Sequence, residues 1–179
     1  MIDSEEIISD TRRWLERAVI GLKLCPYAAS VYSANRVRFC VSEARTAEEL
    51  ILDLERELRA LDEKDPVDCE TTLLIHPQAL TEFVEYNDFL SVSDGLLIEL
   101  KLEGELQIAS FHPYYQFAGS GSDDIENYTN RSPYPLLQLL REASVEAAIA
   151  GGADAQVICD ANMRTLRDLG ADGWARLWR

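Results

Sequence analysis

The sequence is poor in histidine, cysteine and proline, and basic residues are far fewer than acidic ones. Its 179 residues include 2 His, 4 Cys and 6 Pro, and 17 Lys and Arg against 32 Asp and Glu give a formal net charge of -15 at pH 7. A surface this acidic repels nucleic-acid phosphates and anionic lipids, so we expect no nucleic-acid partner. No apolar run approaches the ~18 residues of a membrane span, so we expect no membrane association either.

The cysteines are scattered and none stands in CxxC spacing with another; they are Cys25, Cys40, Cys69 and Cys159. This spacing indicates neither a disulfide framework nor a zinc knuckle, and it favours a reducing compartment. The N-terminal segment MIDSEEIISD is acidic, whereas a secretory signal peptide starts with basic residues and continues with an apolar run. We therefore expect a cytoplasmic protein.

The apolar pattern predicts one α/β domain over residues 1–179. Short apolar or alternating segments predict strands over 36–41, 71–75 and 106–111. Helical spacing predicts helices over 4–22, 47–62, 78–86, 87–102 and 160–169. Strands that alternate with helices favour right-handed crossovers between parallel strands. We therefore expect a small, three-stranded, largely parallel sheet with helices packed on it.

A further helix is predicted after Ser132 and Pro133, which suit the N-cap and the first helical position. Its buried face would carry leucines and alanines at helical spacing, namely Leu136, Leu139, Leu140, Ala143 and Ala147. Gly151 and Gly152 would end it.

Both histidines occupy equivalent places in the sequence. His76 and His112 each follow a predicted strand directly, and each precedes a proline. If the two strands are parallel, both imidazoles lie at the sheet edge where open parallel sheets bind ligands. Imidazole acts there as an acid or base near neutral pH, or as a metal ligand. The alternative is structural, because each histidine could cap its strand by hydrogen bonding to nearby backbone.

Two imidazoles need further ligands to hold a divalent metal. The candidates beside His76 and His112 are Cys25, Asp123, Asp124 and Glu126, although no ligand pair has a diagnostic spacing. Cys25 is a candidate nucleophile if a histidine lies close enough to stabilise its thiolate. Burial as a small apolar residue is the alternative for Cys25.

Residues 112–132 show no helical or strand period and are rich in aromatic and polar side chains. A loop of this length in a compact domain is commonly functional, so we expect it to cover a small-molecule pocket. Arg131 would bind an anionic group of the ligand, or it would instead pair with Asp123 or Asp124. Orienting hydrogen bonds would come from Tyr115, Gln116, Asn127, Tyr128 and Asn130.

Several segments together resemble one protein family. They are LKLCPYA (22–28), ETTLLIHP (70–77), YNDFL (86–90), FHPYYQFAG (111–119), NYTNRSPYP (127–135), LLREAS (139–144) and LGADGW (169–174). These motifs resemble DUF1415, a family of bacterial and plant proteins to which no activity is assigned. The resemblance implies that sites concentrate at Cys25, His76, His112 and the loop through Asn130 and Arg131.

The sequence departs from the family pattern at two positions. Tyr114 stands where relatives often carry Asp, and Gln138 stands where many carry His. If that histidine binds a ligand in relatives, its loss here leaves two imidazoles and weakens the expectation of a metal.

Two functions stay open from the sequence. The leading hypothesis is a small-molecule enzyme in which His76 and His112 carry out acid/base or metal-assisted hydrolysis while Arg131 anchors an anionic substrate. The alternative is a non-catalytic domain that recognises a ligand or a partner through its aromatic loop. A homo-oligomer is compatible with either hypothesis.

Overall fold

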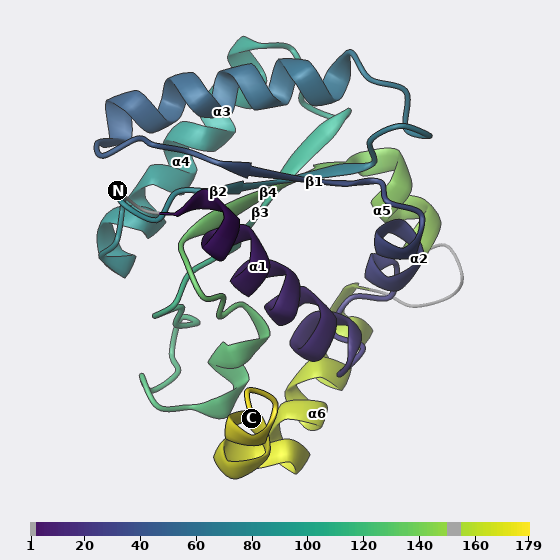
Figure 1. Cartoon of the computed structure of the whole chain (residues 1–179), viewed down its shortest axis with the longest axis vertical. Helices are drawn as coiled ribbons and strands as arrows, with labels where there is room; N and C mark the ends of the chain where they lie inside the picture. Colours follow the sequence, from purple (N-terminus) through teal and green to yellow (C-terminus); the bar gives the residue numbers. More distant parts are fainter. Residues whose placement is uncertain (1–2, 150–154) are drawn as a thin grey trace.

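A four-stranded mixed sheet forms the centre of the computed structural model, which describes residues 3–149 and 155–179 (Figure 1). Its strands are β1 (Val37–Val41), β2 (Thr71–Ile75), β3 (Leu106–Phe111) and β4 (Leu136–Arg141), in the order β1-β2-β4-β3. β1 is parallel to β2, and β4 is antiparallel to both of its neighbours. Consequently β1, β2 and β3 all run in one direction, and β4 lies between β2 and β3 and runs in the opposite direction.

The α/β class is therefore as predicted, but the expected three-stranded, largely parallel sheet is wrong in strand number and in direction. The segment predicted as a helix after Pro133 forms β4 followed by the short helix α5 (Glu142–Ile149). Ser132 caps no helix there, since its hydroxyl donates to the carbonyl of Tyr134. The predicted helix end at Gly151 and Gly152 lies outside the described residues.

The leucine pattern of β4 explains the wrong prediction. Leu136, Leu139 and Leu140 have helical spacing, but the run LLQLLR also suits a strand that is covered on both faces. Leu136 packs in the core on one face of the sheet, while Leu137 and Leu139 pack in the core on the other. Pairing with a strand on each side decides in favour of the strand.

The remaining elements are helical. They are α1 (Ser4–Trp14), the π-helix η1 (Leu15–Ile20), α2 (Ala28–Ser33), α3 (Ala47–Asp62), α4 (Phe83–Glu99), the 3-10 helix η2 (Ile125–Thr129) and α6 (Ala155–Arg176). The predicted helix over 47–62 is confirmed, and it begins at Thr46, whose hydroxyl accepts from the backbone N–H of Glu49. α4 is one helix where two were predicted, and α6 is longer than predicted, with a kink at Gly170.

Helices cover the two faces of the sheet unequally (Figure 1). α3 and α4 pack on one face over a leucine-rich core that includes Leu50, Leu54, Leu58, Leu74 and Leu137. On the other face, α1 and η1 pack over a smaller core that includes Ile7, Trp14, Ala18, Ile75 and Leu136. α2, α5 and α6 complete the second face around its rim.

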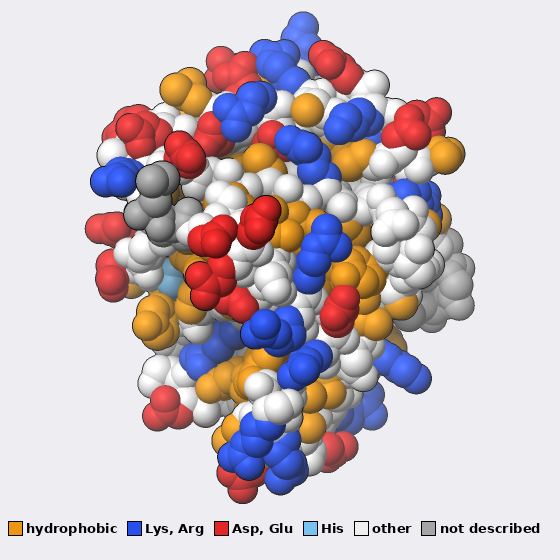
Figure 2. All heavy atoms as spheres, in the orientation of Figure 1, with side chains coloured by type: hydrophobic (Ala, Val, Ile, Leu, Met, Phe, Trp, Pro, Cys, Tyr) orange, Lys and Arg blue, Asp and Glu red, His pale blue; other side chains and the backbone are white. Residues whose placement is uncertain are grey.

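Charge is unevenly spread despite the large net negative value. On the face shown in Figure 2, acidic side chains cluster over the start of α1, while basic side chains lie over its later part and gather at the end of α6. In the described ranges, no helix combines the length and the apolar character needed to cross a membrane.

Candidate functional site

The two histidines lie at the same edge of the sheet. β2 and β3 run in the same direction on either side of β4, so His76 and His112 both follow the carboxyl end of a strand. Tyr86 of α4 lies between them, with ring-centroid distances of 5.7 Å to His76 and 5.0 Å to His112. The His76 and Tyr86 rings are stacked, and the His112 ring is tilted against Tyr86, so the three rings form one cluster that packs α4 against this edge.

Backbone groups occupy most of the histidine nitrogens, and both residues are 0% exposed. His112 Nδ1 accepts from the N–H of Tyr114 at 3.0 Å, so its Nε2 carries the proton that it donates to the carbonyl of Leu80 at 3.2 Å. His76 Nδ1 donates to the carbonyl of Ala79 at 2.9 Å, and its buried Nε2 has no partner in the described chain. The accepting Nδ1 of His112 requires a neutral imidazole with its proton on Nε2, and the bond from Nδ1 of His76 places a proton on that nitrogen.

Burial also keeps the histidines uncharged. Loss of solvent lowers the pKa of His76 to about 4 and also lowers the pKa of His112. An acid/base group has to reach its substrate within hydrogen-bond distance. Both rings are closed off from solvent in this structure, so the geometry favours the structural alternative for the pair.

The residues predicted to bind a metal do not form a ligand set. Within residues 3–149 and 155–179, no group of three or more His, Cys, Asp and Glu is placed to hold a metal ion. Asp123 and Asp124 are exposed, and the Asp124 carboxylate accepts from the N–H of Gly121 at 2.7 Å. The donors present therefore do not fit a divalent metal at His76 and His112.

The loop over residues 112–132 is held together by its own polar side chains. Asn127 is fully buried, where its Oδ1 accepts from the N–H of Phe117 at 3.0 Å and its Nδ2 donates to the carbonyl of Gly121 at 2.7 Å. Gln116 donates to the carbonyl of Ser120 at 2.6 Å. These amides stabilise the loop conformation and leave little capacity for orienting a ligand.

Arg131 is likewise committed to the loop. Its guanidinium donates to the carbonyls of Tyr115 at 3.2 Å and Ser122 at 2.6 Å, and it lies 4.4 Å from the centre of the Tyr128 ring. Tyr128 in turn packs edge-on against Trp174, and Tyr115 packs against Phe83 and Phe117. Arg131 therefore pairs with neither Asp123 nor Asp124 in this structure but fastens the loop through carbonyl groups.

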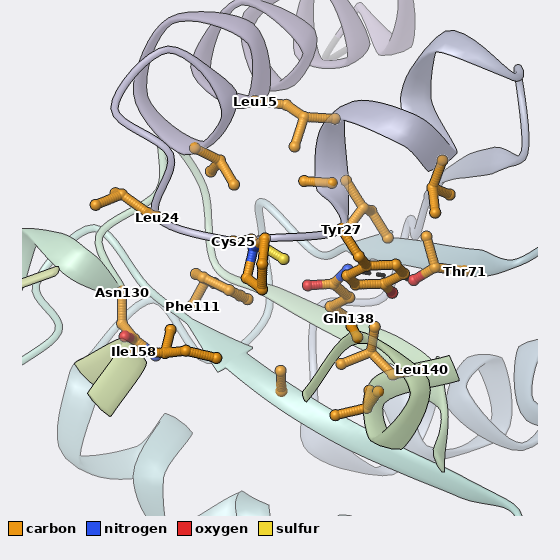
Figure 3. Close-up of a pocket in the computed structure, with 18 of the residues that line it drawn as sticks. Leu15, Leu24, Cys25, Tyr27, Thr71, Phe111, Asn130, Gln138, Leu140 and Ile158 are labelled. Carbon is orange, nitrogen blue, oxygen red and sulfur yellow. Dashed lines mark hydrogen bonds between the residues drawn. The ribbon is translucent and has the colours of Figure 1, made fainter. Parts of the chain in front are cut away.

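A distinct cavity of about 260 Å³ lies on the sheet face that carries α1 (Figure 3). The strands supply its floor, with Val37, Thr71, Leu73, Ala109, Gln138 and Leu140. The segment from η1 to α2 supplies one wall, with Leu15, Val19, Leu24, Cys25, Tyr27 and Val31. α5 and α6 supply another, with Val145, Ala148, Ile149, Ile158 and Asn162. No charged side chain is among the described residues that line it.

Cys25 lies in this cavity, whereas neither histidine is part of its lining. Burial raises the pKa of the Cys25 thiol, and only the backbone amides of Tyr27 and Ala28 act in the opposite direction. The thiol is therefore protonated at neutral pH, which is unfavourable for a nucleophile. The structure does not bring Cys25 and the histidines into one site.

Few polar groups accompany the apolar lining of the cavity. Gln138 projects from the middle of β4, where its neighbours across the strands are Leu73 and Ala109. Asn130 and Asn162 also line the cavity. The hydroxyls of Tyr27 and Thr129 are buried without a hydrogen bond of good geometry in the described chain. Of these residues, sequence reasoning identified Asn130 as a site residue and missed the others.

One sequence signal was available for Gln138. It is the sole polar residue within the run LLQLL, a position that a strand buried on both faces rarely gives to an amide without a reason. The helical interpretation of that run concealed the signal. For Asn162 and Tyr27 the sequence offers no comparable indication.

Fold and cavity together define a mixed α/β domain with a ligand-sized cavity on one face of its sheet, and the lining residues that the structure describes carry no charge. The chain matches the family model described as Protein of unknown function (DUF1415) over residues 6–176, and it belongs to this family. The resemblance inferred from the sequence motifs is thus confirmed. No match was found among curated proteins or among solved structures.

Proposed function

We propose that this protein binds a small, largely apolar molecule in the cavity over its sheet. The observation that carries the proposal is a cavity of about 260 Å³ with no charged side chain among its described lining residues, in a chain of which 27% is charged. An apolar cavity of about 150 Å³ holds one benzene molecule. The present cavity therefore suits a molecule with on the order of ten non-hydrogen atoms.

The cost of an empty cavity supports a ligand. Protein cores are close-packed, and an unfilled void destabilises a fold by roughly 24 cal/mol per Å³. The present cavity is partly open to solvent, so the rate for a sealed void overstates the cost here, but water in a space lined mainly by apolar groups makes few hydrogen bonds. A ligand that fills the cavity offsets that cost by restoring the missing contacts.

Binding is better supported than hydrolysis by the histidine pair. His76 and His112 are buried and hydrogen bonded to backbone, and the thiol of Cys25 is protonated. No cation is among the described residues of the lining, so the anionic ligand expected from Arg131 finds no counter-charge from them. The proposal therefore adopts the binding-domain hypothesis but places the ligand over the sheet, with the aromatic loop contributing Thr129 and Asn130 to one end of the cavity.

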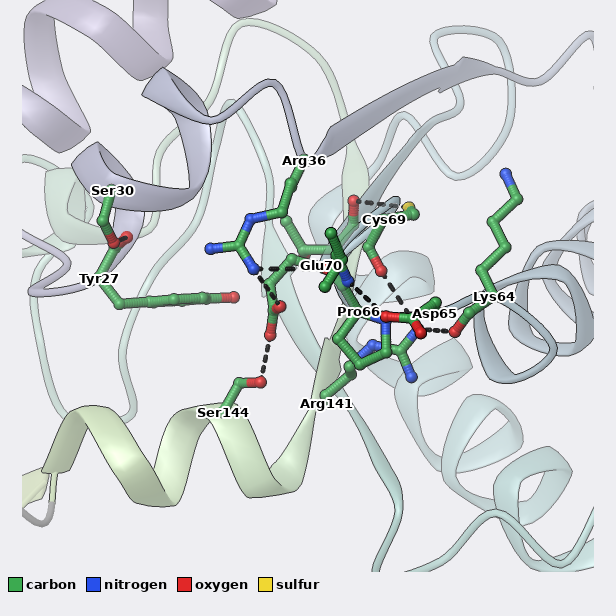
Figure 4. Close-up of polar contacts among 12 residues, drawn as sticks. Tyr27, Ser30, Arg36, Lys64, Asp65, Pro66, Cys69, Glu70, Arg141 and Ser144 are labelled. Atoms are coloured by element: carbon green, nitrogen blue, oxygen red, sulfur yellow. Dashed lines mark hydrogen bonds and ion pairs between the residues drawn. The ribbon is translucent and has the colours of Figure 1, made fainter.

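The wall formed by α5 provides a route for exchange. None of the residues of α5 is buried, although Val145, Ala148 and Ile149 line the cavity. The helix is fastened at its start, where the Ser144 hydroxyl donates to the Glu70 carboxylate (Figure 4). Glu70 is itself buried and pairs with Arg36 at 3.2 Å. The N–H of Glu142 also donates to the carbonyl of Glu105 at 2.9 Å. A thinly packed helix that is fastened near its start is suited to opening for a ligand.

Titration with toluene and phenol, followed by ¹H–¹⁵N NMR, tests the proposal. We expect shift changes concentrated at Cys25, Ala109 and Gln138. Ala148→Phe fills the cavity and should abolish these changes. Ala147→Phe is the matched control, because Ala147 is the adjacent alanine on α5 and is exposed. Changes scattered over the surface, or equal binding by both variants, would refute the proposal.

A further inference from the structure

The orientation of the Gln138 amide is fixed by its partner. Gln138 Nε2 lies 3.2 Å from the hydroxyl of Thr71, and that hydroxyl donates its one proton to the carbonyl of Leu139 at 2.7 Å. A hydroxyl that already donates has only acceptor capacity left for Gln138, so the group facing it is the amide nitrogen. The Gln138 carbonyl oxygen consequently lies on the opposite side of the amide from Thr71 (Figure 3).

The amides of Asn130 and Asn162 are fixed in the same manner. Asn130 Nδ2 donates to the carbonyl of Ser110 at 3.0 Å, and Asn162 Nδ2 donates to the carbonyl of Leu24 at 2.8 Å. A main-chain carbonyl only accepts, so the opposite amide orientation is excluded in both cases. Each side chain has thus committed its nitrogen to the protein framework.

The three amide oxygens are left without partners. None makes a hydrogen bond within the described chain, and none is among the solvent-inaccessible side-chain atoms that lack a partner. Asn162 is only 7% exposed as a residue, and all three residues line the same cavity. β4, α6 and the end of the aromatic loop therefore each contribute to the lining of one largely apolar cavity a residue whose amide oxygen has free acceptor capacity.

Groups that would donate to a ligand are fewer. The indole N–H of Trp14 is taken by the carbonyl of Arg131, and the unpartnered hydroxyls of Tyr27 and Thr129 are sealed from open space. Each fixed amide nitrogen has already made one hydrogen bond, whereas each oxygen has made none. Gln107 is a further amide in the lining, and no hydrogen bond within the described chain fixes its orientation.

The absence of charge limits the ligand further. No Lys, Arg or His and no Asp or Glu is among the described residues that line the cavity. A charged ligand would lose its hydration there without a counter-charge, which is strongly unfavourable. Acceptor oxygens in an uncharged, apolar cavity instead complement a neutral donor.

We infer that the ligand is an uncharged molecule that presents N–H or O–H groups to the carbonyl oxygens of Gln138, Asn130 and Asn162. The inference rests on the proposed function, since it names the class of molecule that the cavity selects. The apolar lining holds the ligand skeleton, and the amide oxygens orient it.

Matched probes separate this inference from the proposed function. Indole and indene share one fused-ring shape, but only indole has an N–H, and benzofuran offers an acceptor without a donor. Benzamide and benzoate differ in charge at nearly constant shape. Dissociation constants for the full chain follow from NMR titration. We expect indole to bind about tenfold more tightly than indene and benzofuran, and benzamide to bind where benzoate does not.

Substitution of Gln138 tests whether this residue is responsible for the preference for indole over indene. Gln138→Met keeps the side-chain length, removes the amide and leaves the bond from Thr71 to Leu139 in place. It should reduce the preference for indole over indene at least threefold, while Ala147→Phe leaves it unchanged. If Gln138→Met does not fold, the probe pairs in the unaltered protein still decide.

The outcomes are distinct. If no probe binds, the proposed function fails, and this inference fails with it. If indene and benzofuran bind as tightly as indole, the cavity binds small molecules but the inferred donor recognition is wrong. Benzoate binding as well as benzamide would equally overturn the inference.

Discussion

Mild acid should destabilise this protein through His76, which the fold holds as a neutral imidazole. Its pKa falls from an ordinary 6.5 to about 4 in the folded chain. Below pH 6.5 the unfolded chain therefore takes up a proton that the folded chain does not accept until about pH 4. Stability from this residue is complete above that window, declines through it as the pH falls, and levels off below it.

The size of the effect follows from the two pKa values. A difference of about 2.5 units at 1.36 kcal/mol per unit corresponds to a loss on the order of 3 kcal/mol over the whole window. Between pH 7 and pH 5 the same linkage gives about 2 kcal/mol. Protonation of His112 acts in the same direction, because burial lowers its pKa as well.

Urea denaturation at pH 7, 6 and 5 measures the free energy of unfolding. His76→Asn removes the titration and retains an amide donor for the carbonyl of Ala79. The variant should be less stable at pH 7 but should lose about 2 kcal/mol less than the unaltered protein on going to pH 5. Parallel losses in the two proteins would show that His76 does not remain neutral in the folded chain, and the reasoning would be refuted.

Three further predictions concern other contacts. Tyr86→Phe should lower the free energy of unfolding by about 2–3 kcal/mol in urea denaturation, because the buried hydroxyl accepts from the N–H of Phe111 and donates to the carbonyl of Leu136. The control Tyr114→Phe, at an exposed position, should change this free energy by less than about 0.5 kcal/mol. Equal effects of the two substitutions would contradict a stabilising role of the Tyr86 hydroxyl. Ser144→Ala should speed the exchange of bound phenol by about tenfold in NMR line-shape analysis, since it removes a hydrogen bond to a charged group that is worth about 1.5 kcal/mol or more; unchanged rates would show that α5 is not the route. Arg131→Met should speed proteolytic cleavage within residues 112–132 and change the affinity for phenol by no more than about twofold. A large loss of affinity without faster cleavage would instead show that Arg131 binds the ligand directly.

Local sequence signals predicted those elements whose structure depends on neighbouring residues. Thr46 and Glu49 marked the start of α3, and the run TTLLI marked a strand that is buried along its whole length. β4 was mistaken for a helix because its leucines satisfy both periods and only pairing with β2 and β3 distinguishes them. The extra strand and its direction could not be read from periodicity.

In the candidate site, too, the sequence predicted what depends on local residues and missed what depends on packing between distant segments. The strand ends placed both histidines at one edge, but their burial depends on Tyr86 and on the carbonyls of Ala79 and Leu80, which the sequence does not bring near them. The cavity needs side chains from the sheet, the segment around Cys25 and two helices near the end of the chain. Such a space is a product of packing, so no single motif predicts it.

The position of β4 has a consequence for how the chain acquires its structure during synthesis. Among the strands that the structure describes, β3 pairs with β4 alone, whereas β1 and β2 pair with each other. A nascent chain that ends before Leu136 thus contains a strand with both edges unsatisfied, and such edges promote association between chains. We expect ribosome-bound chains truncated there to recruit chaperones, and release from them to follow once residue 141 has left the exit tunnel.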